Sequence, residues 1–295
     1  MSFFYKIKCL SPCPQVIDLS AEEQFNWGMR YLSGTGFDFK KAVCCLTLAS
    51  EKNYLPAQRE LGTLFIDKGF SKAQVEKGRR LLLQAAESGD IKAQFRLALH
   101  YFESQDDVNG DMWLLEAAAK NFTPALNTLA RRCLDRKISE KGIDDAVYYF
   151  TLSAESGDAE AFYELGKLEK DPVKALQHFR QGAQLGHPGA LRNVGKLLLP
   201  VEPDKAVRYL NSAAEQGDGE AQYLLGLHFA DSDPVKSAMW HTIAITFGCE
   251  KASEALSKQI EKLSDEQIEE SADHVCDWFS RIISEDAKAQ SLLKK

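Results

Sequence analysis

The sequence predicts an all-α solenoid of about seven helix-turn-helix repeats that ends in a C-terminal capping helix. Three observations support this prediction. The hexapeptide AAESGD at residues 85–90 returns nearly unchanged at residues 153–158 and 213–218. A motif Ala-x-x-x-Leu-small recurs every 29 to 36 residues, and a second series of small residues lies between its copies. Small residues spaced along apolar stripes are what two closely packed helices require.

The first helix of each repeat is expected around the Ala-x-x-x-Leu-small motif. A weak copy begins at Glu23, and a decayed copy begins at Ala252. The copies between them begin at Ala57, Ala93, Ala125, Ala161, Ala190 and Ala221. The first residue of each copy is called the anchor below, and other positions of the repeat are counted from it.

The second helix of each repeat is expected around a second small residue. Apolar residues follow most of these positions three and four residues later, as in the run Ala146-Val-Tyr-Tyr-Phe150. The seven positions are Ala42, Gly78, Asp111, Ala146, Ala175, Ala206 and Ala238.

The hexapeptide marks the junction between one repeat and the next. Gly89 can take the left-handed conformation that ends a helix, and Asp90 can cap the helix that follows. Gly157–Asp158 and Gly217–Asp218 repeat this pair, and Asn53 and Asn121 stand at the glycine position elsewhere. Proline then falls in the first helical turn, at Pro56, Pro124 and Pro188. We expect the unequal spacing to come from the loop inside each repeat, with the junction between repeats staying short.

The two ends of the chain are expected to cap the stack. We divide the chain into an N-terminal capping segment (1–20), the repeats (21–250) and a C-terminal helical cap (251–295). Ser264 and Gln267 form a capping box at the start of the last helix. The apolar side of this cap comprises Ile260, Leu263, Ile268, Val275, Trp278 and Phe279.

Composition narrows the class of protein. The 295 residues carry a formal charge of −7, which argues against general nucleic-acid binding. No apolar stretch is long enough for a membrane span, and the start of the chain lacks a secretory signal. Seven cysteines at irregular spacing do not form a disulfide framework, and Cys9 and Cys13 have no matching second pair. A reducing cytoplasm fits best.

No catalytic or metal-binding constellation is visible. The six histidines are scattered, without metal-ligand spacing, and no cofactor is expected. The Gly34-x-Gly36 loop lacks the preceding strand and third glycine of a phosphate loop, so a structural turn is favoured. Trp27, Trp113, Trp240 and Trp278 fall at core-like positions.

The motifs as a set resemble Sel-one-like repeats (SLR), which are relatives of the tetratricopeptide repeat (TPR). The resemblance rests on Ala-x-x-x-Leu-Gly, on the loop from Gly34 to Ala42 and on Ala-Ala-Glu-x-Gly-Asp, over residues 21–250. Residues 264–279 also resemble the closing helix of bacterial members. Only the first repeat keeps the full loop, and Ala98 and Ala130 replace the motif glycine. The resemblance implies a right-handed α/α superhelix whose concave groove binds a partner polypeptide, as a non-enzymatic scaffold or adaptor.

The resemblance to TPR proteins also implies that positions two and six after each anchor line the groove. These residues are Phe25, Met29, Arg59, Thr63, Phe95, Leu99, Asn127, Arg131, Tyr163, Lys167, Arg192, Lys196, Tyr223 and Leu227. Five are basic and none is acidic, which favours an anionic or carboxylate-bearing partner segment. Chance, or long basic side chains packing on apolar surface, would give the same composition.

Two other functions stay open. The chain could be an immunity protein that neutralises a toxin or secreted effector, because a solenoid with one tight groove suits that role. A hydrolase is less favoured, since the sequence offers no convergent polar groups for catalysis.

Overall fold

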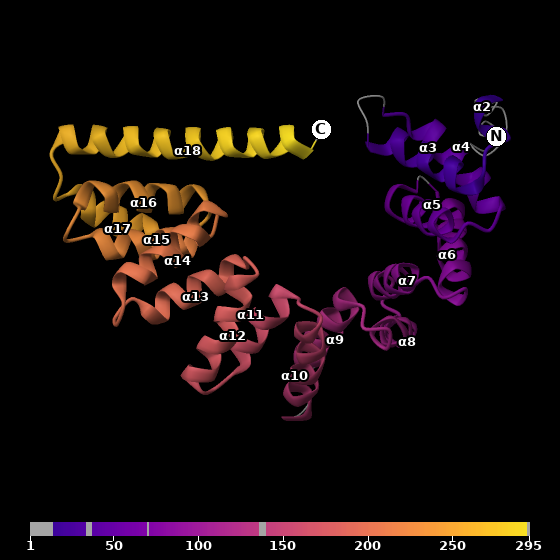
Figure 1. Ribbon diagram of the computed structural model, residues 1–295, viewed down its shortest axis with the longest axis horizontal. Helices are drawn as coiled ribbons and strands as arrows, with labels where there is room; N and C mark the ends of the chain where they lie inside the picture. Colours follow the sequence, from indigo (N-terminus) through magenta and orange to yellow (C-terminus); the bar gives the residue numbers. More distant parts are fainter. Residues whose placement is uncertain (1–13, 34–36, 70, 136–139, 294–295) are drawn as a thin grey trace. The chain divides into compact units, whose positions relative to one another are not determined.

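The computed structural model describes residues 14–33, 37–69, 71–135 and 140–293, which form helices and no strand (Figure 1). The all-α repeat fold is confirmed. Cys9, Cys13 and the Gly34-x-Gly36 turn lie outside the described residues. The helices are α2 (Pro14–Ile17), α3 (Ala21–Ser33), α4 (Phe39–Glu51), α5 (Leu55–Lys68), α6 (Lys72–Glu87), α7 (Ile91–Glu103), α8 (Asp107–Ala118), α9 (Thr123–Asp135), α10 (Glu140–Glu155), α11 (Ala159–Leu168), α12 (Pro172–Gln184), α13 (Pro188–Leu198), α14 (Pro203–Glu215), α15 (Gly219–Phe229), α16 (Pro234–Thr246), α17 (Lys251–Ile260) and α18 (Asp265–Leu293).

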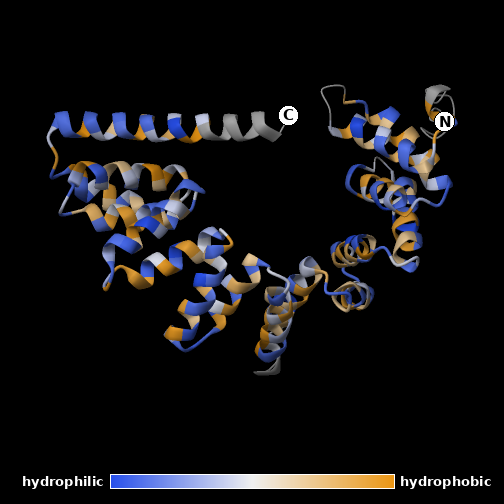
Figure 2. Cartoon of the chain, viewed as in Figure 1, coloured by the Kyte–Doolittle hydropathy of each residue, from blue (hydrophilic) through white to orange (hydrophobic). Residues whose placement is uncertain are grey.

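Consecutive helices pack as antiparallel hairpins. The most extensive contacts join α3 to α4, α5 to α6, α7 to α8, α11 to α12, α13 to α14 and α15 to α16. The odd-numbered helix from α3 to α15 is called the A helix of its hairpin, and the even-numbered helix from α4 to α16 is called the B helix. The amphipathic alternation of hydrophobic and hydrophilic residues along these helices is visible in Figure 2.

The chain divides into two compact units, residues 1–149 and residues 150–295. Within the units, successive A helices touch one another, as α5 touches α7, α11 touches α13, and α13 touches α15. Among the described residues, no two successive B helices pack as extensively. The A side of each stack is therefore the narrower one. It is called the inner face below, and the B side is called the outer face.

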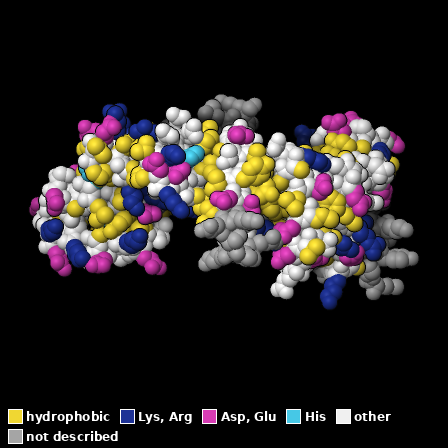
Figure 3. Space-filling view, turned by 90° about the horizontal axis from the view of Figure 1, so that it is seen from below, with side chains coloured by type: hydrophobic (Ala, Val, Ile, Leu, Met, Phe, Trp, Pro, Cys, Tyr) yellow, Lys and Arg dark blue, Asp and Glu magenta, His cyan; other side chains and the backbone are white. Residues whose placement is uncertain are grey.

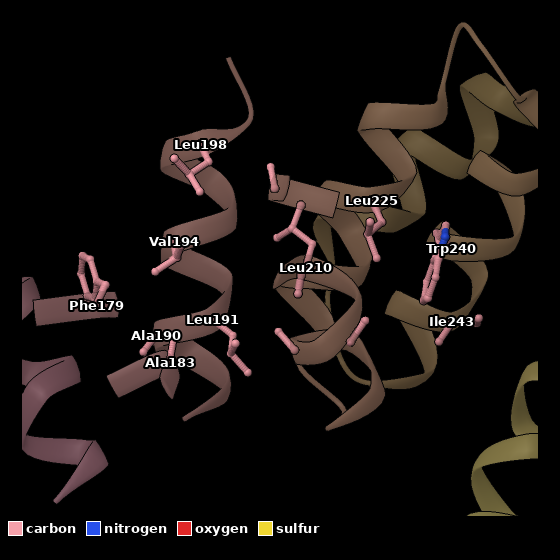
Figure 4. Close-up of a cluster of buried hydrophobic side chains, with 14 of the residues drawn as sticks. Phe179, Ala183, Ala190, Leu191, Val194, Leu198, Leu210, Leu225, Trp240 and Ile243 are labelled. Atoms are coloured by element: carbon pink, nitrogen blue, oxygen red, sulfur yellow. The ribbon is translucent and has the colours of Figure 1, made fainter. Parts of the chain in front are cut away.

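The motif positions hold each hairpin together. Gly62 of α5 meets α6 so closely that an added Cβ would lie 2.9 Å from the Gly78 carbonyl oxygen and 2.9 Å from Leu82 Cγ. Gly166 and Gly195 are covered in the same way by Phe179 and Leu210. Figure 4 shows Phe179, Leu210 and Leu225 within the apolar cluster of the second unit. The same contact, in which a small residue of the A helix packs against a large side chain of the B helix, recurs in these hairpins. It is called the seat of the hairpin below.

The leucines of the motif occupy equivalent buried seats, as predicted. Leu61, Leu129 and Leu165 are 1%, 7% and 6% exposed. The anchors Ala57, Ala93, Ala125, Ala161, Ala190 and Ala221 are fully buried. The closest contacts within the stack therefore fall where the periodic Ala, Gly and Leu predicted them.

Two positions of the second series were placed one residue too far along the chain. In α8 the buried small residue is Gly110, while Asp111 is half-buried and accepts a hydrogen bond from Arg132 Nε at 2.9 Å. In α16 the seat belongs to Ser237, whose Oγ donates to the Gly226 carbonyl oxygen at 2.8 Å. Spacing cannot choose between adjacent candidates, because only the partner helix decides which one fits.

The junctions between repeats follow the predicted chemistry with one exception. Gly89 has φ +91° and Asn53 has φ +58°, both in the left-handed region. Asp90 caps α7 by accepting the Ala93 N–H at 2.9 Å. Asp158 stands at the cap of α11 but makes no such bond, because its Oδ2 accepts from Ser153 Oγ at 2.9 Å.

The expectation that loop length alone sets the repeat spacing is wrong. The B helices range from 12 residues in α8 to 16 in α6 and α10. The A helices range from 10 residues in α11 to 14 in α5. Whole helical turns are thus gained or lost without disturbing the central seats that hold each hairpin.

The C-terminal helix begins at the predicted capping box. The Ser264 N–H donates to Gln267 Oε1 at 3.0 Å, and the Gln267 N–H donates to Ser264 Oγ at 3.3 Å. Trp278 of α18 packs against Trp240 of α16 with ring centroids 6.2 Å apart. Two expected core residues are not buried, since Trp27 and Ile260 are each 39% exposed.

Candidate partner-binding face

The structure separates the two sets of predicted groove residues. Each residue two positions after an anchor lies near the junction with the next repeat. In five repeats it contacts the residue three positions before the next anchor. We call these contacts the seam pairs. Three are aromatic, with ring centroids 4.5–5.6 Å apart: Phe25–Tyr54, Phe95–Phe122 and Tyr163–His187.

The other two seam pairs are ionic. Arg59 Nη1 donates to Asp90 Oδ2 at 2.7 Å, and Arg192 Nη1 donates to Asp218 Oδ2 at 2.6 Å. Both carboxylates also cap the helix that follows, so each one links two repeats. The arginine side chains are only 16% and 18% exposed.

The second ionic seam is extended by neighbouring groups. Arg192 Nε lies 3.4 Å from Glu220 Oε2, and Arg192 Nη2 donates to the Tyr163 hydroxyl at 3.3 Å. Burial lowers the pKa of Arg192, but the Asp218 hydrogen bond and the two carboxylate charges raise it overall. The guanidinium is therefore charged and already neutralised by its own protein.

The remaining residues at position two are also held in the stack. Asn127 is 8% exposed, and the Tyr223 ring lies 5.6 Å from the His241 ring. The predicted row contains five basic residues. Two of them, Arg59 and Arg192, hold neighbouring repeats together, and their positive charges are neutralised by Asp90 and Asp218.

The residues six positions after the anchors are more accessible. Arg131, Lys167, Lys196 and Leu227 are exposed, whereas Met29, Thr63 and Leu99 are half-buried. Lys167 Nζ lies 2.9 Å from Glu164 Oε2 and 5.1 Å from the centre of the Tyr163 ring. Lys196 makes no hydrogen bond or ion pair with another described residue. Side chains at position six are therefore the ones on the inner face that solvent, or a partner, can reach.

A glutamine that follows the anchor in several repeats has a role that the sequence motifs did not predict. Gln94 and Gln222, each following an anchor, are buried and donate from Nε2 to the carbonyl oxygens of Ala86 and Ala214 at 3.0 Å. These bonds satisfy the end of the preceding B helix. The signal was the recurring Ala-Gln dipeptide, which is also present at residues 57–58. Its role is structural.

The structure also bears on metal ions, thiols and membrane spans. None of their His, Cys, Asp and Glu side chains gather in groups of three or more that could hold a metal ion. Cys249 and Cys276 are free thiols. In the part of the chain that the structure describes, no helix combines the length and apolar character needed to cross a membrane.

Comparisons with known proteins agree with this architecture. The Sel1 repeat model matches residues 24–54, 55–90, 91–122, 129–158, 159–187, 191–218 and 219–246. An uncharacterized protein of Neisseria meningitidis serogroup B is 30% identical over 156 residues, which are 48% of this chain and 33% of that protein. The chain thus spans about a third of the length of that relative.

Two solved structures share the fold. One is a protective antigen present in uropathogenic Escherichia coli strains, which displays an SLR fold. Its TM-score is 0.63 at 22% identity, covering 92% of this chain and 71% of that one. The other is a Sel1 repeat protein from Oxalobacter formigenes, with a TM-score of 0.63 at 20% identity, covering 77% and 98%. Since seven family matches cover most of its length, the chain belongs to the Sel1 repeat family.

Proposed function

We propose that this chain is a non-enzymatic scaffold that binds a partner polypeptide on the inner face of its A helices. The supporting observation is the accessibility of position six, at Lys167, Lys196 and Leu227 in the second unit. These side chains leave the stack on its narrower side and are not needed for contacts between repeats. Membership of the Sel1 repeat family, whose folds serve as interaction scaffolds, supports the same proposal.

The partner segment should be anionic and should carry an apolar residue. Lys196 offers a charge that no described group neutralises, and Leu227 is 45% exposed. The pair Lys167–Glu164 can rearrange at small cost, because exposed ion pairs stabilise by only about 0–1 kcal/mol. The seam pairs beneath hold the backbone in place, which limits the ordering cost of binding. In the first unit, Arg131 is exposed at the same position of its repeat.

The test is affinity capture with a charge-reversed inner face. Lys167→Glu with Lys196→Glu should remove the captured partner, identified by mass spectrometry, without changing the thermal unfolding midpoint. The matched control is Lys174→Glu with Lys205→Glu, which makes the same charge change on exposed lysines of α12 and α14. Capture that survives the inner double variant would overturn the proposal. A subnanomolar Kd for a toxin or effector would instead favour the neutralising role.

A further inference from the structure

The outer face of α8 carries an open apolar row. Val108 is 81% exposed, and Met112 and Leu115 are each 47% exposed. Their spacing of four and three residues places all three on one side of the helix. Single exposed apolar residues are common on protein surfaces, but a contiguous row indicates a contact surface.

The same positions are polar on two other B helices, α6 and α14. Relative to the small seat residue, the row begins two residues before it and continues two residues after it. On α6 these positions hold Glu76 and Arg80, which form an ion pair at 3.2 Å. On α14 they hold Asp204 and Arg208. The stack itself therefore does not require apolar side chains there.

On α16 the same positions are apolar and a helix covers them. They hold Val235 and Met239, which are 9% and 8% exposed, followed by Trp240. The helix α18 lies against α16, as Figure 1 also shows. Met239, Trp240 and Trp278 belong to one apolar cluster. Within this chain, Val-x-x-x-Met-Trp on an outer face is a seat for an amphipathic helix.

The row on α8 repeats this seat. Val108, Met112 and Trp113 stand at the positions of Val235, Met239 and Trp240. Trp113 packs into the local core, but Met112 remains open. The α8 row thus has the composition of the α16 seat without a helix over it.

Charge indicates which helix fits. The helix α8 contains Asp107, Asp111 and Glu116 and no Lys or Arg. Arg132 of α9 engages the first two at 2.9 Å, whereas Glu116 is exposed. The helix α18 is rich in Asp and Glu, so the α18 of a second copy would meet like charges. Figure 3 shows hydrophobic side chains with acidic ones beside them on the side of the molecule that it draws.

We propose that the outer face of α8 docks an amphipathic helix of another protein whose apolar stripe is flanked by Lys and Arg. Val108, Met112 and Leu115 would receive the apolar stripe, and the exposed Glu116 would pair with the basic flank. This site lies on the opposite side of the hairpin from the inner face, so a partner could occupy each.

The probe is a synthetic peptide based on α18. It spans residues 268–283 with Glu269→Lys, Glu270→Lys, Asp273→Lys and Asp277→Lys, and the unmodified sequence serves as the acidic comparison. Binding to the full chain is measured by fluorescence anisotropy of the labelled peptide. The basic peptide should bind at least tenfold more tightly than the acidic one, and added salt should weaken it.

Variants locate the bound peptide. Met112→Glu with Leu115→Glu should weaken the basic peptide at least tenfold, which corresponds to about 1.4 kcal/mol. Val108→Glu should also weaken it, and this residue is exposed enough that folding is not at risk. The matched control is Val173→Glu on α12, a lone valine that is 66% exposed. It should leave binding unchanged.

Three results would overturn the proposal. The first is no saturable binding at about 1 mM peptide. The second is binding that the α8 variants leave unchanged. The third is self-association of the chain that Met112→Glu abolishes, because that would assign the row to a second copy. Failure here leaves the inner-face test unaffected, since the two sets of variants lie on different helices.

Discussion

A buried histidine should make the last hairpin sensitive to acid. His241 is 1% exposed and covers Gly226, with ring atoms 2.5 Å from where a Cβ of that glycine would lie. In other hairpins Leu82, Phe179 or Leu210 occupies this seat. His241 Nδ1 has no hydrogen-bond partner among the described residues. Burial lowers the pKa of His241 from 6.5 to about 4.

The sign and size of the effect follow from this shift. A folded-state pKa below the unfolded value means that stability is fully present above pH 6.5 and is lost as the pH falls toward 4. The whole shift corresponds to about 3 kcal/mol, of which about 2 kcal/mol should be lost by pH 5. Leucine does not titrate, so His241→Leu should remove this part of the pH dependence. At pH 7.5 the variant should match the wild type within about 1.5 kcal/mol.

The assay compares the free energy of unfolding of both proteins in denaturant at pH 7.5, 6 and 5. Carboxylates elsewhere titrate in both proteins and cancel in the difference. Hydrogen exchange of the α16 amides locates the effect, because local opening of this hairpin should precede global unfolding at pH 5. Parallel loss of stability in wild type and His241→Leu between pH 7.5 and 5 would refute the reasoning.

Two further predictions concern the stack itself. Arg192→Ala should lower the free energy of unfolding by about 1.5–3 kcal/mol, because it leaves the 9%-exposed Asp218 carboxylate without its charged donor. A double-mutant cycle with Asp218→Ala should give a coupling of at least about 0.5 kcal/mol, and strict additivity would contradict the ionic seam. Gly62→Ala should lower the free energy of unfolding by about 1–3 kcal/mol, since its methyl group would meet the Gly78 carbonyl oxygen. A Gly62→Ala variant as stable as the wild type would contradict this prediction, because it would mean that α5 and α6 can move apart at no cost in free energy.

Much of the fold could be predicted from the sequence because small residues at helix crossings leave a periodic signal. The recurring motif alone predicts that Leu61, Leu129 and Leu165 occupy equivalent buried positions. The pattern gives the wrong residue at Asp111 and Ala238, because a second small residue precedes each of them directly in the sequence. The lengths of the helices could not be predicted from the motif either, because an extra turn at the end of a helix leaves the buried contact positions unchanged.

The roles of the candidate site residues could not be predicted from the sequence. The anchors pick out the positions that are predicted to line the groove, yet nothing local distinguishes Arg192, which pairs with Asp218 within the stack, from Lys196, which is exposed. The distinction depends on Asp218, 26 residues further along the chain. A contact between repeats can be identified only when the structure shows which residues of the two repeats touch.

The seam pairs constrain how such a chain can change in length. Ring pairs and Arg–Asp pairs alternate along the first unit, from Phe25–Tyr54 through Arg59–Asp90 to Phe95–Phe122. Both members of each pair lie within one matched repeat, so deletion of residues 55–90 would remove Arg59 together with Asp90 and leave Phe25–Tyr54 and Phe95–Phe122 intact. Recombination in the gene is therefore expected to preserve the pairing when it adds or removes whole repeats at these boundaries, and to break it when the cut falls between two partners.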